Sequence, residues 1–152
     1  ERIITICSID RWVTMYLYDT DNNIQVADRL FSIANDREID SGLKEGAERA
    51  AIGRLYYGCY HRVNEIVKNN YGDNIPYHRN AQGIHEKTIF ALENCPSNGF
   101  DKEDKEEIVS DMICLKGYRH HADYIKSRPF TSRQIDTATE LAKDIHEKLK
   151  RF

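Results

Sequence analysis

The stretch ERAAIGRLYYGCYHRVNEIV, residues 48–67, decides the fold that this sequence predicts. Its apolar residues recur at the spacing of one face of an α-helix, and they are Ile52, Leu55, Tyr56, Cys59, Val63, Ile66 and Val67. The stripe begins near Leu43 and ends at Asn69, where the turn-forming residues Asn-Tyr-Gly-Asp follow. We therefore expect a long amphipathic helix over residues 43–69.

Further segments on either side of this helix show the same period. They predict helices over residues 21–36, 80–93 and 102–126, and from Thr131 or Ser132 to about residue 149, with Pro76, Pro96 and Pro129 between them. Helices joined by short loops are antiparallel neighbours. The expected fold class is an all-α, up-and-down antiparallel bundle of about five helices.

The first residues of the chain are ambiguous. Residues 1–18 fit either a strand or a helix, and we favour a helix after Ser8. We find no internal repeat, low-complexity tract or linker. The sequence therefore predicts a single domain over residues 1–152, with residues 1–20 as an uncertain N-terminal extension.

Composition and charge restrict the class of protein. In 152 residues, 40% are hydrophobic, which is enough for one core without disulfides or metal. The net charge of −3 gives no global positive field, so any contact with nucleic acid is local. The four cysteines form no CxxC pair and suggest reduced thiols. With neither a membrane span nor a secretory leader in the pattern, we expect a cytoplasmic protein.

A charge interrupts the apolar stripe of the helix expected over residues 102–126. Arg119 stands where the next apolar residue should be in the series Ile108, Met112, Leu115 and Ala122. An arginine keeps its charge, so on this face it needs partners, either Asp123 one turn along or groups of a facing helix. Arg119 is thus half of a structural ion pair or part of an anion site.

The histidines beside Arg119 favour the anion site. His120 and His121 place titratable rings within one turn of a fixed cation, as in phosphoryl-transfer sites. They project roughly 100 and 200 degrees round the helix from Arg119, so within one chain both cannot share its face. Either a dimer brings them together, or one of them is a plain surface residue. We expect Arg119, His121 and His120 as catalytic candidates, with Asp123 and Tyr124 binding or orienting the substrate.

Two other clusters carry polar groups. Tyr57 and His61 stand one turn apart across Gly58, and we favour a polar-edged core there, with substrate binding as the alternative. Arg79 and His85 lie six positions apart at the start of the next helix, where we favour a cap or loop role.

Metal and cofactor motifs do not occur. None of the six histidines belongs to an HxxxH or HExxH pair, and we find neither a Gly-rich phosphate loop nor a GxSxG elbow. We expect no metal and no cofactor.

Two segments, in this order, resemble the HEPN family (higher eukaryotes and prokaryotes nucleotide-binding). Residues 48–67 resemble its long helix with an A…YYA…H pattern, and LKGYRHHADYI, residues 115–125, resembles its RxxADY segment. The segments GIHEKTIFAL, residues 83–92, and IDTATELAKDIHEKL, residues 135–149, extend the resemblance to roughly residues 24–150.

This resemblance implies a function. Many HEPN proteins are metal-independent ribonucleases with an R-x4-6-H motif, an arginine and a histidine separated by four to six residues, contributed by two subunits that face each other across a dimer cleft. Arg119 would be that arginine, but the residues five to seven places after it are Tyr124, Ile125 and Lys126. His121, more than His120, would then move protons.

We therefore expect a HEPN-type RNA-binding protein or metal-independent endoribonuclease of a prokaryotic defence or toxin–antitoxin system. It would act as a homodimer, with an antitoxin or other protein as a possible partner. The alternative is a non-catalytic bundle that binds a nucleotide or a protein partner.

Overall fold

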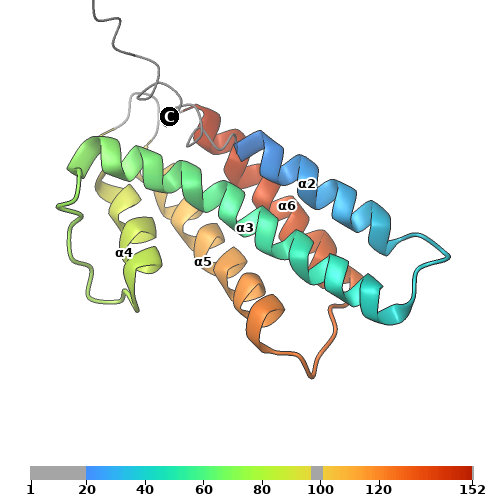
Figure 1. Ribbon diagram of the computed structural model, residues 1–152. Coiled ribbons are helices and arrows are strands. Elements are labelled where there is room, and N and C mark those ends of the chain that lie inside the picture. The colour runs from blue at the N-terminus through green and yellow to red at the C-terminus, as the bar shows by residue number, and fades with distance from the viewer. Residues whose placement is uncertain (1–19, 97–100, 152) are drawn as a thin grey trace, which may run out of the picture.

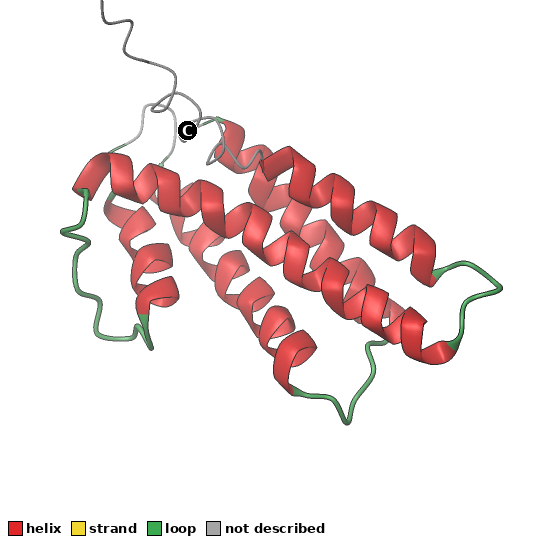
Figure 2. Ribbon diagram, in the orientation of Figure 1, coloured by secondary structure: helices red, strands yellow, loops and turns green. Residues whose placement is uncertain are grey.

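The computed structural model describes residues 20–96 and 101–151, and all regular structure within these ranges is helical (Figure 2). The helices are α2 (Thr20–Ala34), α3 (Ser41–Tyr71), α4 (Ile84–Ala91), η1 (Leu92–Asn94), α5 (Lys102–Tyr124) and α6 (Ser132–Lys150). The expected all-α bundle of about five helices is confirmed. The ambiguous segment 1–18 lies outside the described residues.

The long helix α3 is the centre of the bundle. It packs against α2, α4, α5 and α6, and long helices that follow one another in the chain run in opposite directions (Figure 1). The short helix α4 lies beside the C-terminal half of α3 and also contacts α5. The first turn of α4 and the second half of α5 therefore flank the same side of α3.

Side-chain caps set where the long helices begin. The Asp40 carboxylate accepts two backbone N–H groups at 2.8 and 3.0 Å, so α3 starts two residues before the expected Leu43. Asp101 caps α5 in the same way, and Thr131 with Gln134 forms a capping box on α6. Gly72, at φ 57°, follows the last residue of α3.

The helix expected over residues 80–93 is shorter in the structure. It begins at Ile84, because Gly83 has a φ of 108° and so lies outside the helical region. The backbone N–H of Gln82 donates to the Glu86 carboxylate at 2.6 Å in place of a helical bond. After Ala91 the chain tightens into η1.

The predicted stripes form the core. Every apolar residue of the stripe on α3 is buried, and so are Ile108, Met112, Leu115 and Ala122 on α5. No helix within residues 20–96 and 101–151 has an apolar run that could cross a bilayer.

Arg49 of α3 holds the C-terminal end of α5. Its guanidinium pairs with Glu45 at 2.6 Å and lies 5.9 Å from the centre of the Phe130 ring. It also donates to four carbonyl oxygens at 2.9–3.2 Å, those of His121, Ala122, Ile125 and Arg128. This contact fixes the loop between α5 and α6.

Candidate functional site

Arg119 points from α5 toward α3, and groups of both helices hold its guanidinium. Nη2 donates to the Tyr57 hydroxyl at 2.8 Å, and Nε lies 2.7 Å from Oδ2 of Asp123. The Asp123 contact is an ion pair without hydrogen-bond geometry, because Nε is buried and makes no hydrogen bond. Only 20% of the Arg119 side chain is exposed. Both partner types expected from the sequence, Asp123 and a facing helix, are present.

Two aromatic rings flank the same guanidinium. Its central carbon lies 5.3 Å from the centre of the Tyr57 ring and 5.7 Å from that of Tyr124. These distances fit cation–π contacts. Tyr57 is half-buried, whereas Tyr124 is 64% exposed and presents its ring to solvent.

One nitrogen of Arg119 stays open. Nη1 has no hydrogen-bond partner among the described residues, and it is not among the buried polar atoms that lack a partner. A guanidinium whose other nitrogens are positioned by the protein thus offers Nη1 to a ligand oxygen.

The two adjacent histidines lie apart from each other. His120 packs its ring 4.9 Å from that of Tyr124, beside Arg119. His121 lies on another face of α5, where Nε2 is 2.8 Å from the Arg128 carbonyl oxygen and the ring is 4.4 Å from that of Phe130. Within one chain, His121 therefore anchors the loop after α5 rather than facing Arg119.

The predicted pair on α3 belongs to the Arg119 cluster. The rings of Tyr57 and His61 lie 6.1 Å apart, and the Tyr57 hydroxyl accepts the hydrogen bond from Arg119. Tyr57 therefore connects α3 to the predicted site on α5.

His85, for which the sequence favoured a cap or loop role, is part of this cluster in the structure. Its Nδ1 lies 2.8 Å from the buried Tyr56 hydroxyl, and its ring stacks on Tyr60 at 4.1 Å and 16°. Its ring also lies 6.2 Å from that of Tyr57. The run of tyrosines on one face of α3 was the available signal, but only the packing of α4 shows what it faces.

A salt bridge holds His85 in this position. Glu86, the next residue, pairs with Lys116 of α5 at 2.6 Å, and the two side chains are 15% and 28% exposed. The hydrogen bond from Lys116 lowers the pKa of Glu86 below its ordinary value. The first turn of α4 is thereby tied to α5 one turn before Arg119.

The surroundings of His85 keep its ring neutral. Burial lowers the pKa of His85 below its usual value, and the cations Arg119 and Lys116 lower it further. Burial also raises the pKa of the Tyr56 hydroxyl, with Tyr60 adding to the effect. Both groups are uncharged near neutral pH.

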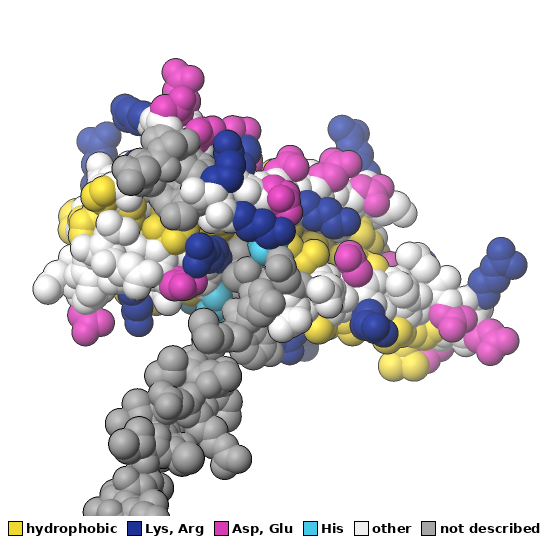
Figure 3. Space-filling model, turned by 90° about the horizontal axis from the view of Figure 1, so that it is seen from above, with side chains coloured by type: hydrophobic (Ala, Val, Ile, Leu, Met, Phe, Trp, Pro, Cys, Tyr) yellow, Lys and Arg dark blue, Asp and Glu magenta, His cyan; other side chains and the backbone are white. Residues whose placement is uncertain are grey.

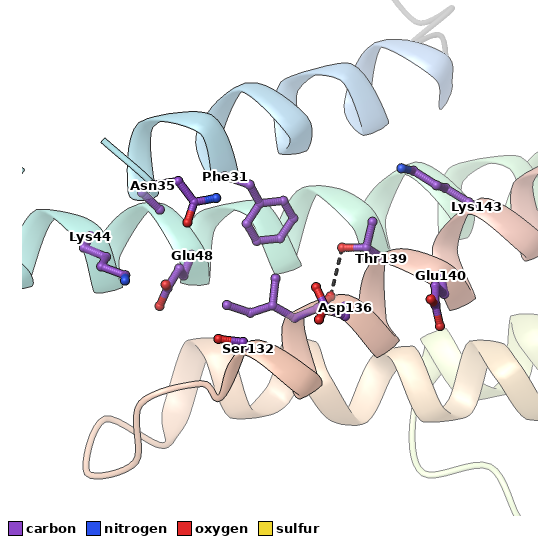
Figure 4. A pocket seen from close by; sticks show the side chains of 11 residues that line it. Phe31, Asn35, Lys44, Glu48, Ser132, Asp136, Thr139, Glu140 and Lys143 are labelled. Carbon is purple, nitrogen blue, oxygen red and sulfur yellow. Dashed lines mark hydrogen bonds between the residues drawn. The ribbon is translucent and has the colours of Figure 1, made fainter. Parts of the chain in front are cut away.

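A cavity lies elsewhere in the bundle. It occupies about 500 Å³ between α2, α3 and α6 (Figure 4), and the apolar residues that line it are Phe31, Ala34 and Ile135. The charged residues around it are Lys44, Glu48, Asp136, Glu140 and Lys143. Carboxylates outnumber lysines there, which disfavours an anionic ligand, and none of the predicted site residues lines this cavity.

Lys and Arg are interspersed with Asp and Glu on the face shown in Figure 3, and no continuous positive patch covers that face. Within the described ranges, no cluster of three or more His, Cys, Asp or Glu side chains could hold a metal ion.

Comparisons with known proteins give no relative of this chain. No family model matches it, and neither the curated proteins nor the solved structures contain a match.

Proposed function

We propose that this chain is a HEPN-type protein that binds RNA through Arg119. The observation that carries the proposal is the open Nη1 of a guanidinium whose other nitrogens contact Tyr57 and Asp123. A positioned guanidinium loses little freedom when it binds, and it matches the oxygens of a phosphate. The resemblance of residues 115–125 to the RxxADY segment supports the same residue.

Aromatic groups beside Arg119 suit the rest of a nucleotide. Tyr124 is exposed next to the guanidinium, and His120 packs against it. Bases stack on such rings without regard to sequence, while a cation holds the backbone. Because Asp123 and Glu86 offset part of the positive charge here, we expect short single strands to be preferred over long duplexes.

Fluorescence anisotropy with a labelled single-stranded RNA in chelator tests this proposal. Loss of one charged hydrogen bond costs about 1.5–3 kcal/mol, so Arg119→Ala should weaken binding roughly 10-fold to 100-fold. Arg119→Lys keeps the charge but not the planar geometry, so its RNA affinity should lie between that of wild type and that of Arg119→Ala. The salt dependence of binding should become shallower in Arg119→Ala.

The matched control is Arg29→Ala. Arg29 is exposed on α2, which contacts α3 and α6 but neither α4 nor α5. Its removal changes the net charge equally and should leave affinity within about twofold. Equal affinities for wild type, Arg119→Ala and Arg29→Ala would contradict the proposal, provided that thermal melts show all three folded.

A second candidate is a non-catalytic bundle that binds a free nucleotide or a protein partner. The position of His121 favours it, because this histidine contacts the Arg128 carbonyl and not the Arg119 face. Calorimetry with mononucleotides and RNA, together with a cleavage assay in chelator, separates the candidates. The resemblance also implies a homodimer in a defence or toxin–antitoxin system, and sedimentation of the purified chain tests the dimer.

A further inference from the structure

The burial of Tyr56 determines which group is the donor in the hydrogen bond between its hydroxyl and His85. Tyr56 is 0% exposed, and among the described residues its hydroxyl has His85 Nδ1 as its hydrogen-bond partner, at 2.8 Å. A buried hydroxyl hydrogen without an acceptor is strongly disfavoured. If Nδ1 carried the hydrogen and donated to the phenol oxygen, the Tyr56 hydrogen would have no acceptor in the described part of the chain. Tyr56 is therefore the donor, and Nδ1 accepts.

This hydrogen bond fixes the tautomer of His85. A neutral imidazole carries one N–H hydrogen. Because Nδ1 accepts a hydrogen bond, that hydrogen is on Nε2. The position of the ring is also fixed, by the stack on Tyr60 and by the Glu86–Lys116 ion pair at the next residue.

The Nε2 of His85 is open to a ligand. It makes no hydrogen bond within residues 20–96 and 101–151, and it is not among the buried polar atoms without a partner. His85 and Arg119 adjoin the same tyrosine, since the Tyr57 ring lies 6.2 Å from the His85 ring and its hydroxyl accepts from Arg119. Two positioned N–H donors, His85 Nε2 and Arg119 Nη1, thus belong to residues that both adjoin Tyr57.

We infer that His85 is a second ligand-binding residue, which donates a hydrogen bond from Nε2 to a phosphate or ribose oxygen of the ligand held by Arg119. The inference rests on the proposed function for the identity of the ligand. In this role His85 stays a neutral donor and does not accept a proton from the RNA 2′-hydroxyl.

The electrostatics around His85 agree with a neutral donor. Burial and the cations Arg119 and Lys116 lower the pKa of the ring, and His61 adds to this effect. Burial raises the pKa of Tyr56, so the phenol keeps the hydrogen that it donates. Glu86 faces Lys116 and offsets one of these cations.

The tautomer is tested directly by long-range proton–nitrogen NMR of the uniformly labelled protein at neutral pH, with His85 assigned from a His85→Gln sample. We expect the hydrogen on Nε2, and a hydrogen on Nδ1 would overturn the inference. In Tyr56→Phe, which retains the buried ring but loses the donor, we expect the preference for this tautomer to weaken.

The binding role is tested by anisotropy with labelled single-stranded RNA in chelator. His85→Ala should weaken binding about tenfold, whereas His85→Gln should stay within about threefold of wild type, because the glutamine amide retains an N–H donor. Wild type should leave the RNA intact. Equal losses in His85→Ala and His85→Gln, or chelator-resistant cleavage that His85→Gln abolishes, would overturn the donor role.

The two proposals fail differently. Weaker binding by Arg119→Ala together with full binding by a folded His85→Ala overturns the role of His85 alone. Full binding by Arg119→Ala overturns the proposed function. Thermal melts of each variant show whether a loss of binding comes from unfolding.

Discussion

Arg49→Ala should destabilise this protein more than its position on a helix surface suggests. The guanidinium is largely covered, with 15% of the side chain exposed, and it donates to four carbonyl oxygens at the end of α5 and in the loop that follows. Charged donors at a helix C-terminus also oppose the negative end of the helix dipole. Alanine removes all of these contacts at once.

The expected loss can be worked out from the bonds. Two of them, to His121 and Ala122, are half-buried, and the other two are exposed. At about 1 kcal/mol for a half-buried bond and about half of that for an exposed one, the total is about 3 kcal/mol. The surface pair with Glu45 adds only about 0.3–0.5 kcal/mol. For a chain of this size, the melting temperature should fall by roughly 6–12 °C.

Urea unfolding followed by circular dichroism measures this loss, with Arg62→Ala as the matched control. Arg62 is also an α3 arginine, but its pair with Glu65 is more exposed, at 31% and 51%. Its removal should cost no more than about 0.5 kcal/mol. Arg49→Lys should lose about half as much as Arg49→Ala, because one ammonium cannot reach all four carbonyls. A loss below about 1 kcal/mol in Arg49→Ala would refute the reasoning.

Three further predictions concern the cluster and its surroundings. Glu86→Gln should lower the free energy of unfolding, measured in urea, by about 1 kcal/mol at neutral pH. Because Lys116 lowers the folded-state pKa of Glu86, this difference from wild type should disappear as the pH falls below the ordinary pKa of 4.5. His121→Ala should lower the melting temperature by a few degrees yet leave RNA affinity within about twofold, and a larger loss of affinity would restore His121 to the site. Asp123→Asn should weaken RNA binding about twofold to fivefold, because the ion pair with Asp123 holds the Arg119 guanidinium in place, and tighter binding would show that the Asp123 charge only opposes the ligand.

The sequence predicted the helices well because their signal is local. The stripe on α3 was found from its period alone, and every residue in it is buried. The start of the helix at α4 was wrong by four residues, because the φ of Gly83 is set by how the loop packs and not by the apolar period. The starts of the capped helices agree better with the sequence: α3 begins two residues before the expected Leu43, and α5 begins at the expected residue 102.

The candidate site was predicted only in part, because its contacts are long-range. Arg119 was visible as a charge in an apolar stripe, and Asp123 is its neighbour one turn along. His85, in contrast, meets Tyr56, which lies 29 residues away, and this contact exists only because α4 packs on α3. Beside Gly83, its local sequence gave the signature of a loop.

In this geometry, a structural ion pair and an anion site at Arg119 do not exclude each other. The pair with Asp123 uses Nε, and the bond to Tyr57 uses Nη2, so the contacts that stabilise the half-buried cation leave Nη1 open. A lysine could not serve both roles, because its three hydrogens rotate about one atom and are not fixed relative to the fold. The planar guanidinium can hold α5 against α3 with one edge and present the other to a ligand. Under the proposed function, the structural contacts are what keeps the binding group in place.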